Sequence, residues 1–127
     1  MAQNDVTTHI RQVGTVAVPV HDPERALAFY HGILGFEIRR DVPFGQGNRW
    51  IEVAPVGAAT TIALAPPGAN ATAVDTGIRL TTADCEADHR ALRELGVAVD
   101  DVMHWPGVPA MFSLRDPDGN TLYVVEG

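Results

Sequence analysis

Three side chains in this sequence are of types that transfer protons in general acid–base chemistry: Glu52, His104 and Tyr123. A carboxylate, an imidazole and a phenol can each take up or release a proton at a bound molecule. The chain places them far apart, and no nucleophile–base pair, carboxylate dyad or glycine-rich phosphate loop stands out. These three residues are therefore candidates for acid–base chemistry, with no reaction assigned to them.

The histidines and the cysteine form no pattern that binds a metal. Cys85 is the only cysteine, which excludes a disulfide framework and a cysteine-rich zinc site. We interpret it as a small packed side chain rather than a reactive thiol. The five histidines include no His-x-x-x-His pair. We interpret four of them as surface residues: His9, His21, His31 and His89.

Arg79, Glu52 and Trp50 are the side chains best suited to holding a bound molecule. The planar fork of an arginine can bind a ligand carboxylate or phosphate. Alternatively, Arg79 and Glu52 pair with each other or reach a subunit interface. Trp50 can stack on an aromatic or cationic ligand, or pack at a sheet or subunit interface.

Length and composition exclude several classes of protein. The chain has 127 residues, 46% of them hydrophobic, and a formal net charge of −7. That charge argues against nucleic acid, whose phosphates attract clustered Lys and Arg. No apolar run approaches the ~20 residues that span a bilayer. The first residues also lack the pattern of a secretory signal, so we expect a cytoplasmic protein without a membrane partner.

The candidate residues lie within a unit that has a regular order of elements. Residues 13–20 alternate in polarity as a strand does. Asp22 is placed to cap a helix that begins at Pro23 and ends at Gly35. The unit continues with three strand-like runs, near residues 36–42, 48–54 and 60–65.

The same β-α-β-β-β order recurs in the second half. Ile78 and Leu80 mark a strand, and Asp84 is placed to cap a helix that ends at Gly96. Strands follow near residues 97–102, 109–115 and 120–126. Asp22 and Asp84 lie 62 residues apart, and a nearly constant offset indicates internal duplication. We predict one domain over residues 1–127, with a module at 10–65, a linker at 66–75 and a module at 76–126.

Strand alternation predicts which side chains face the helices and which face a pocket. The aliphatic sets should face the helices: Val16, Val18, Val20, Ile51, Val53, Ile62, Leu64, Ile78, Leu80, Phe112, Leu114, Leu122 and Val124. The opposite set should line the pocket: Thr15, Ala17, Trp50, Glu52, Thr61, Ala63, Gly77, Arg79, Met111, Ser113, Thr121 and Tyr123. Small residues, aromatic rings and a few polar groups are typical of a ligand pocket.

Two predicted loops carry aromatic residues that suit either a lid or a dimer contact. Residues 42–48 include Phe44, and residues 103–109 include His104 and Trp105. Together with the strand positions, this gives the predicted ligand-binding set: Thr15, Phe44, Trp50, Glu52, Arg79, Trp105, Met111, Ser113 and Tyr123.

Three segments together resemble the vicinal oxygen chelate superfamily, the glyoxalase/bleomycin resistance protein/dioxygenase group. They are residues 18–30 with 33–36, residues 77–84 with 95–97, and residues 112–120, which end in Asp-Pro-Asp-Gly-Asn. The resemblance implies an α+β fold of two βαβββ modules, with curled mixed sheets around a concave pocket. It also implies a homodimer with sites at or near the subunit interface.

Many members of this superfamily hold a divalent metal on four side chains, typically His, Gln or Glu. The resemblance places those positions at Thr15, Ala63, Gly77 and Tyr123. Alanine and glycine have no donor atom, and threonine and tyrosine are unusual ligands. We therefore expect no metal or other cofactor, which disfavours glyoxalase I and extradiol dioxygenase activity.

Three functions remain open. The favoured one is a metal-independent protein that binds, and sequesters, an antibiotic-like or aromatic small molecule. The second is an enzyme of the lyase, isomerase or dioxygenase class, with an atypical metal site or metal-free acid–base chemistry. The third is a regulatory or interaction module, because a fold does not determine a function.

Overall fold

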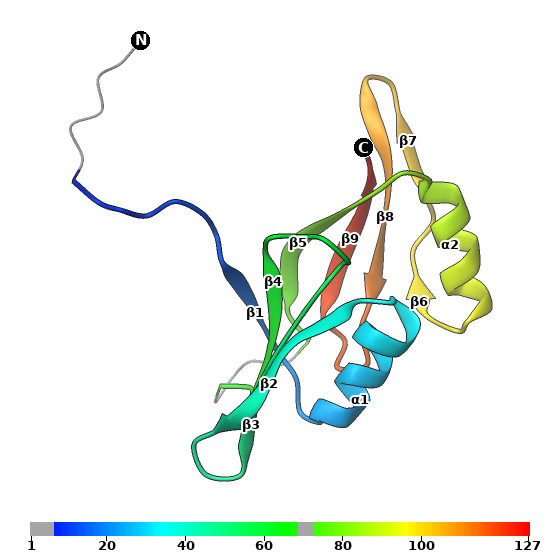
Figure 1. The fold of residues 1–127 in the computed structure, drawn as a ribbon. Helices are drawn as coiled ribbons and strands as arrows, with labels where there is room; N and C mark the ends of the chain where they lie inside the picture. Colours follow the sequence, from blue (N-terminus) through cyan, green and yellow to red (C-terminus); the bar gives the residue numbers. More distant parts are fainter. Residues whose placement is uncertain (1–6, 69–72) are drawn as a thin grey trace.

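The computed structural model describes residues 7–68 and 73–127, which form two sheets and two helical segments (Figure 1). Residues 1–6, and residues 69–72 of the predicted linker, lie outside the described residues. The α+β fold with two mixed sheets is confirmed. Within the two described stretches, no helix is long and apolar enough to cross a membrane.

The first sheet has the strand order β1-β4-β3-β2. β1 and β4 are parallel, and β4, β3 and β2 are joined by antiparallel pairings. Ala63 lies between Ala17 on one side and Glu52 on the other. The strand bounds are β1 Thr15–Pro19, β2 Glu37–Phe44, β3 Asn48–Ala54 and β4 Thr61–Ala65.

The second sheet repeats this arrangement in the order β5-β9-β8-β6. Its bounds are β5 Asp75–Thr82, β6 Ala98–Val99, β8 Val108–Arg115 and β9 Thr121–Glu126. β7, Met103–Trp105, pairs with β8 outside that order. The predicted loop at residues 103–109 is therefore wrong, because the segment forms a β-hairpin turning at residues 106–107. The predicted loop at residues 42–48 is likewise reduced to a three-residue turn, residues 45–47.

The first helix begins as predicted but does not continue as a regular α-helix. Asp22 caps α1, Pro23–Leu27, by accepting a hydrogen bond from the Glu24 N–H at 3.0 Å. Residues Ala28–Ile33 then form a π-helical segment, η1. Its wider turn contains two adjacent buried aromatic side chains, Phe29 and Tyr30. Apolar periodicity predicts a helix here but does not distinguish these two winding patterns.

The second helix, α2 Cys85–Glu94, matches the prediction at both ends. The Asp84 carboxylate accepts a hydrogen bond from the Ala87 N–H at 3.0 Å. Gly96 follows the helix with a φ of +83°, a conformation that glycine adopts at little cost. Cys85 is buried, as expected for a packed thiol, and burial raises its pKa.

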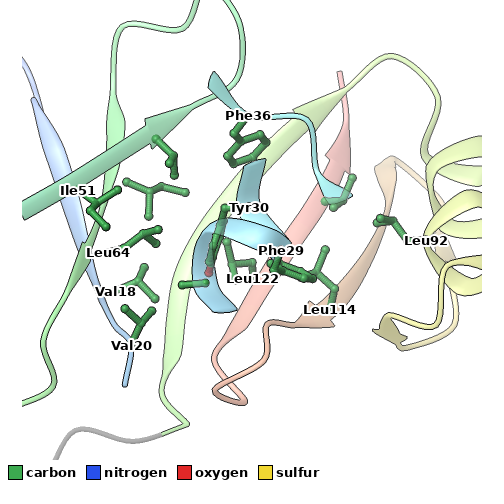
Figure 2. Close-up of a cluster of buried hydrophobic side chains, with 14 of the residues drawn as sticks. Val18, Val20, Phe29, Tyr30, Phe36, Ile51, Leu64, Leu92, Leu114 and Leu122 are labelled. Atoms are coloured by element: carbon green, nitrogen blue, oxygen red, sulfur yellow. The ribbon is translucent and has the colours of Figure 1, made fainter. Parts of the chain in front are cut away.

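The two sheets share one hydrophobic core, and the first helical segment lies between them. Figure 2 shows Phe29 and Tyr30 between Val18 and Leu64 of the first sheet and Leu114 and Leu122 of the second. The predicted helix-facing set belongs to this core or packs against it, apart from Val16. Strand alternation therefore identified the inner face of both sheets.

A buried polar network joins the two halves beside this core. The Asp116 carboxylate accepts hydrogen bonds from the Tyr30 hydroxyl at 2.8 Å and from the Asn120 side-chain amide at 2.9 Å. The same Asn120 amide donates to the Pro19 carbonyl at 2.8 Å. Burial, followed by the nearby Asp116 charge, raises the pKa of Tyr30. The network therefore ties η1 and β1 to the turn before β9.

Candidate functional site

The predicted pocket residues lie on two separate surfaces of the chain. Because both sheets turn one face to the shared core, their opposite faces point away from it. We call the outward side of the first sheet the tryptophan face: Thr15, Ala17, Trp50, Glu52, Thr61 and Ala63. We call the outward side of the second sheet the arginine face: Gly77, Arg79, Met111, Ser113, Thr121 and Tyr123.

The tryptophan face combines a floor of small residues with a wall of larger ones. The floor is formed by Ala17 and Ala63, which are direct neighbours across β1 and β4. Glu52 lies beside Ala63 on β3, with Trp50 one position along the same face. Ala17 is exposed and Trp50 and Glu52 are half-buried, whereas Ala63 is fully buried, so Ala17, Trp50 and Glu52 are the members of this group that can touch a bound molecule.

Trp50 and Glu52 are held together by hydrogen bonds. The Trp50 Nε1–H donates to Glu52 Oε2 at 2.7 Å, and the Thr61 hydroxyl donates to Glu52 Oε1 at 2.7 Å. These two bonds, that from Trp50 first, hold the pKa of Glu52 below its usual value. Glu52 is therefore an ionised acceptor that orients the indole, and it is poorly suited to donate a proton at neutral pH.

A second aromatic ring extends the wall toward the β2–β3 turn. Phe44 meets Trp50 edge-on, with ring centroids 5.7 Å apart. Phe44 is 48% exposed, so much of its ring is free to touch another molecule. The structure thus brings together three predicted ligand-binding residues, Phe44, Trp50 and Glu52, whereas Thr15 lies on β1, at the opposite edge of the sheet from Phe44 on β2.

The arginine face centres on a guanidinium held against a tyrosine ring. The Arg79 Cζ lies 4.3 Å from the centroid of the Tyr123 ring, and the Arg79 Nη1–H donates to the Gly77 carbonyl at 2.8 Å. The Tyr123 hydroxyl donates to Asp75 Oδ2 at 2.7 Å. That hydrogen bond raises the pKa of Tyr123 and lowers the pKa of Asp75.

An irregularity in β5 shapes this arrangement. The pairing of β5 with β9 shifts register between Asp75 and Arg79, and Gly77 has a φ of +70°. A shift of this kind re-aims the side chains around it. Asp75 Oδ1 also accepts a hydrogen bond from the Gly77 N–H at 3.0 Å. These contacts therefore fix the start of β5 in the conformation that positions Arg79.

The remaining predicted ligand-binding residues lie toward β8 and its hairpin. The Ser113 hydroxyl donates to Asp100, which also pairs with Arg115 at 2.9 Å. Met111 and Trp105 line a small apolar cavity of about 70 Å³. Trp105 therefore lies among residues of the β7–β8 hairpin.

The acid–base candidates are not brought together. His104 contacts Glu86 at 2.6 Å on an exposed surface, whereas Glu52 and Tyr123 lie on different sheets. Glu52 and Arg79 make no ion pair with each other within the described chain, so that alternative is wrong for a single protomer. The arrangement supports binding better than proton transfer.

The donor set does not fit a divalent metal. Thr15, Ala63, Gly77 and Tyr123 offer two hydroxyl groups, and neither alanine nor glycine supplies a side-chain donor. Across residues 7–68 and 73–127, no group of three or more His, Cys, Asp or Glu side chains lies close enough to hold a metal ion.

Sequence reasoning missed the acidic partners that fix the arginine face. Asp75 and Asp100 hold Tyr123 and Ser113, but each lies on a different element from the residue it holds. Only the pairing of β5 with β9 brings Asp75 near Tyr123. The hydrogen bond from Thr61 to Glu52 could be anticipated from the sequence, because strand alternation places both residues on one face of the sheet.

Comparisons with known proteins cover nearly the whole chain. Residues 12–124 match the model of the Glyoxalase/Bleomycin resistance protein/Dioxygenase superfamily. TnmS3, an antibiotic binding protein from Streptomyces sp. CB03234, is 37% identical with a TM-score of 0.79, covering 94% of this chain and 98% of that one. A superfamily member from Sphaerobacter thermophilus DSM 20745 is 32% identical with a TM-score of 0.82, covering 94% of this chain and all of that one.

One curated relative matches over a shorter stretch. The uncharacterized protein YetH of Bacillus subtilis (strain 168) is 46% identical over 57 residues, which are 45% of this chain. The match spans 48% of YetH, about half its length.

Proposed function

Because the chain belongs to the glyoxalase/bleomycin resistance protein/dioxygenase superfamily, we propose that it is a metal-independent binding protein that sequesters a small aromatic compound. The observation that carries this proposal is the tryptophan face. There, Trp50 is oriented by Glu52, extended by the exposed ring of Phe44, and shares its face of the sheet with the exposed Ala17. Stacking of a flat ligand on the indole follows from that geometry.

The similarity to TnmS3 supports the same class of function. TnmS3 is an antibiotic binding protein, and its likeness to this chain extends over 94% of the residues at 37% identity. Because the donor set does not fit a divalent metal, binding in this proposal depends on side chains alone. The separated acid–base candidates give no comparable support to an enzyme.

A complete site in this proposal needs two copies of the chain. A small-molecule pocket surrounds most of its ligand, whereas the tryptophan face on one protomer is open on its outer side. The arginine face is also exposed at Arg79, and it carries four more of the predicted ligand-binding residues: Arg79, Met111, Ser113 and Tyr123. We therefore propose a homodimer in which the tryptophan face of one protomer meets the arginine face of its partner.

Titration calorimetry with two uncharged aromatic probes, 2-naphthamide and 9-anthracenecarboxamide, tests the binding function. We expect saturable binding that weakens about tenfold or more in Trp50→Ala, the usual effect of removing a buried aromatic contact. Trp50→Phe keeps a ring and should recover part of the affinity. The proposal fails if neither probe binds the folded protein, or if Trp50→Ala binds both as well as the parent does.

A further inference from the structure

Arg79 is one of five arginines of the described chain that have no carboxylate partner; the others are Arg11, Arg40, Arg90 and Arg93. Arg25, Arg39, Arg49 and Arg115 each lie within 4.0 Å of an Asp or Glu oxygen, whereas Arg79 has no such contact among residues 7–68 and 73–127. Arg79 is nevertheless held in place, by the Tyr123 ring and by the Gly77 carbonyl. Asp75 is near enough for the Arg79 charge to lower its pKa, but no carboxylate oxygen of the described residues lies within ion-pair distance of the guanidinium, which is therefore suited to bind an added anion.

The two carboxylates near this face are already engaged. Asp75 accepts the Tyr123 hydroxyl on one oxygen and the Gly77 N–H on the other. Asp100 accepts from Arg115 and Ser113. Arg115 is therefore neutralised by Asp100. Asp75, in contrast, serves to fix the ring on which Arg79 rests.

The guanidinium retains donors and free space beside it. Of its five N–H donors, the structure accounts for one, in the bond to the Gly77 carbonyl. Gly77 has no side chain, and a Cβ built there would meet only Arg79 Nη1, at 3.9 Å. A planar group with two oxygens can approach this guanidinium and accept a pair of parallel hydrogen bonds.

We propose that the compound bound by this protein is an aromatic carboxylate, whose ring stacks on Trp50 and whose carboxylate is bound by the Arg79 fork. This inference rests on the proposed function and adds the chemical class of the ligand. Tyr123 and Gly77 act as positioning residues, because they hold the guanidinium in place before the ligand arrives. A charge-assisted bidentate pair gives this class an advantage that a neutral aromatic compound lacks.

Three probes with the same ring and different head groups test the inference: 2-naphthoate, 2-naphthamide and 2-naphthylmethylammonium. By calorimetry, we expect 2-naphthoate to bind about tenfold more tightly than the amide, the factor that one hydrogen bond to a charged group supplies. The ammonium probe should bind most weakly. Equal binding of naphthoate and amide, or a preference for the ammonium probe, overturns the inference and leaves the binding function intact. Absence of binding by all three overturns both.

Variants of Arg79 show whether the preference arises at this residue. Arg79→Gln should weaken naphthoate binding about tenfold and so abolish its preference over the amide. Arg79→Lys keeps the charge but loses the fork, and should retain only part of the preference. Arg93→Gln removes the same charge from α2 and is the matched control, with the preference unchanged. A preference that persists in Arg79→Gln, with its melting temperature close to the parent's, overturns the assignment.

Discussion

The tryptophan face and the arginine face occupy equivalent places in two similar sheets, yet their side chains are opposite in character. The strand registers align Ala17–Ala63–Glu52 across the first sheet with Arg79–Tyr123–Ser113 across the second. Where the first sheet has two alanines, the second has an arginine on a tyrosine. Where the first has a carboxylate, the second has a small hydroxyl.

This difference shows how one repeated unit supplies two complementary surfaces. The difference is greatest on the inner strands, where Arg79 on β5 and Tyr123 on β9 occupy the places of Ala17 on β1 and Ala63 on β4. The shared core leaves both faces free to diverge, because their side chains point away from it. The functional consequence is the proposed division between ring binding and charge binding.

The largest expected effect comes from breaking the link that holds the two sheets in one core. Asp116→Ala removes the acceptor of the Tyr30 hydroxyl and of the Asn120 amide, both in buried surroundings. We expect a loss of about 3 kcal/mol in the free energy of unfolding, because buried donors are left unpaired. Urea denaturation measures it. Tyr30→Phe removes only one donor and should cost about 1 kcal/mol. Similar values for both variants would contradict the network.

A smaller effect on stability should distinguish Gly77 from Thr15, the residue at the equivalent place in the first sheet. Gly77 has a φ of +70°, whereas its counterpart in the first unit, Thr15, lies in regular strand pairing. Gly77→Ala should cost about 1–2 kcal/mol through backbone strain, and Thr15→Ala about 0.5 kcal/mol or less. Gly77→Ala should also weaken naphthoate binding, since it moves the carbonyl that holds Arg79. Equal stability costs would show that the two positions are equivalent.

The smallest effect concerns the pH dependence of the Glu52 contacts. Hydrogen bonds from Trp50 and Thr61 lower the folded-state pKa of Glu52 below its ordinary value of 4.5. A lowered carboxyl pKa stabilises the fold above the unfolded-state value, and this contribution is lost as the pH falls through the folded-state value. The parent protein should therefore lose more stability on acidification below 4.5 than Glu52→Gln does. Parallel losses in the two proteins, measured by denaturation across that range, would contradict the hydrogen-bond geometry.

The fold could be predicted from sequence further than the site could. Alternation identified the inner faces, and the caps at Asp22 and Asp84 located both helix starts. The π-helical turn and the hairpin at residues 103–109 were not visible, because neither has a distinct pattern of apolar residues. The pocket set was chosen by alternation alone, which says which side of a strand a residue lies on. Alternation cannot say that two outward faces belong to opposite sides of a shared core.

The division of one site between two protomers is tested most directly by mixing variants. Trp50→Ala and Arg79→Gln, carrying different affinity tags, are refolded together and the hybrid dimers are purified through both tags. In a hybrid, one site contains both changes and the other contains neither. Calorimetry with 2-naphthoate should therefore find one site per hybrid dimer with the affinity of the parent, although neither variant alone has such a site. Hybrids that bind 2-naphthoate no more tightly than the two single variants would contradict the account. Such a result would mean that the two faces form a site within one protomer or do not form a common site.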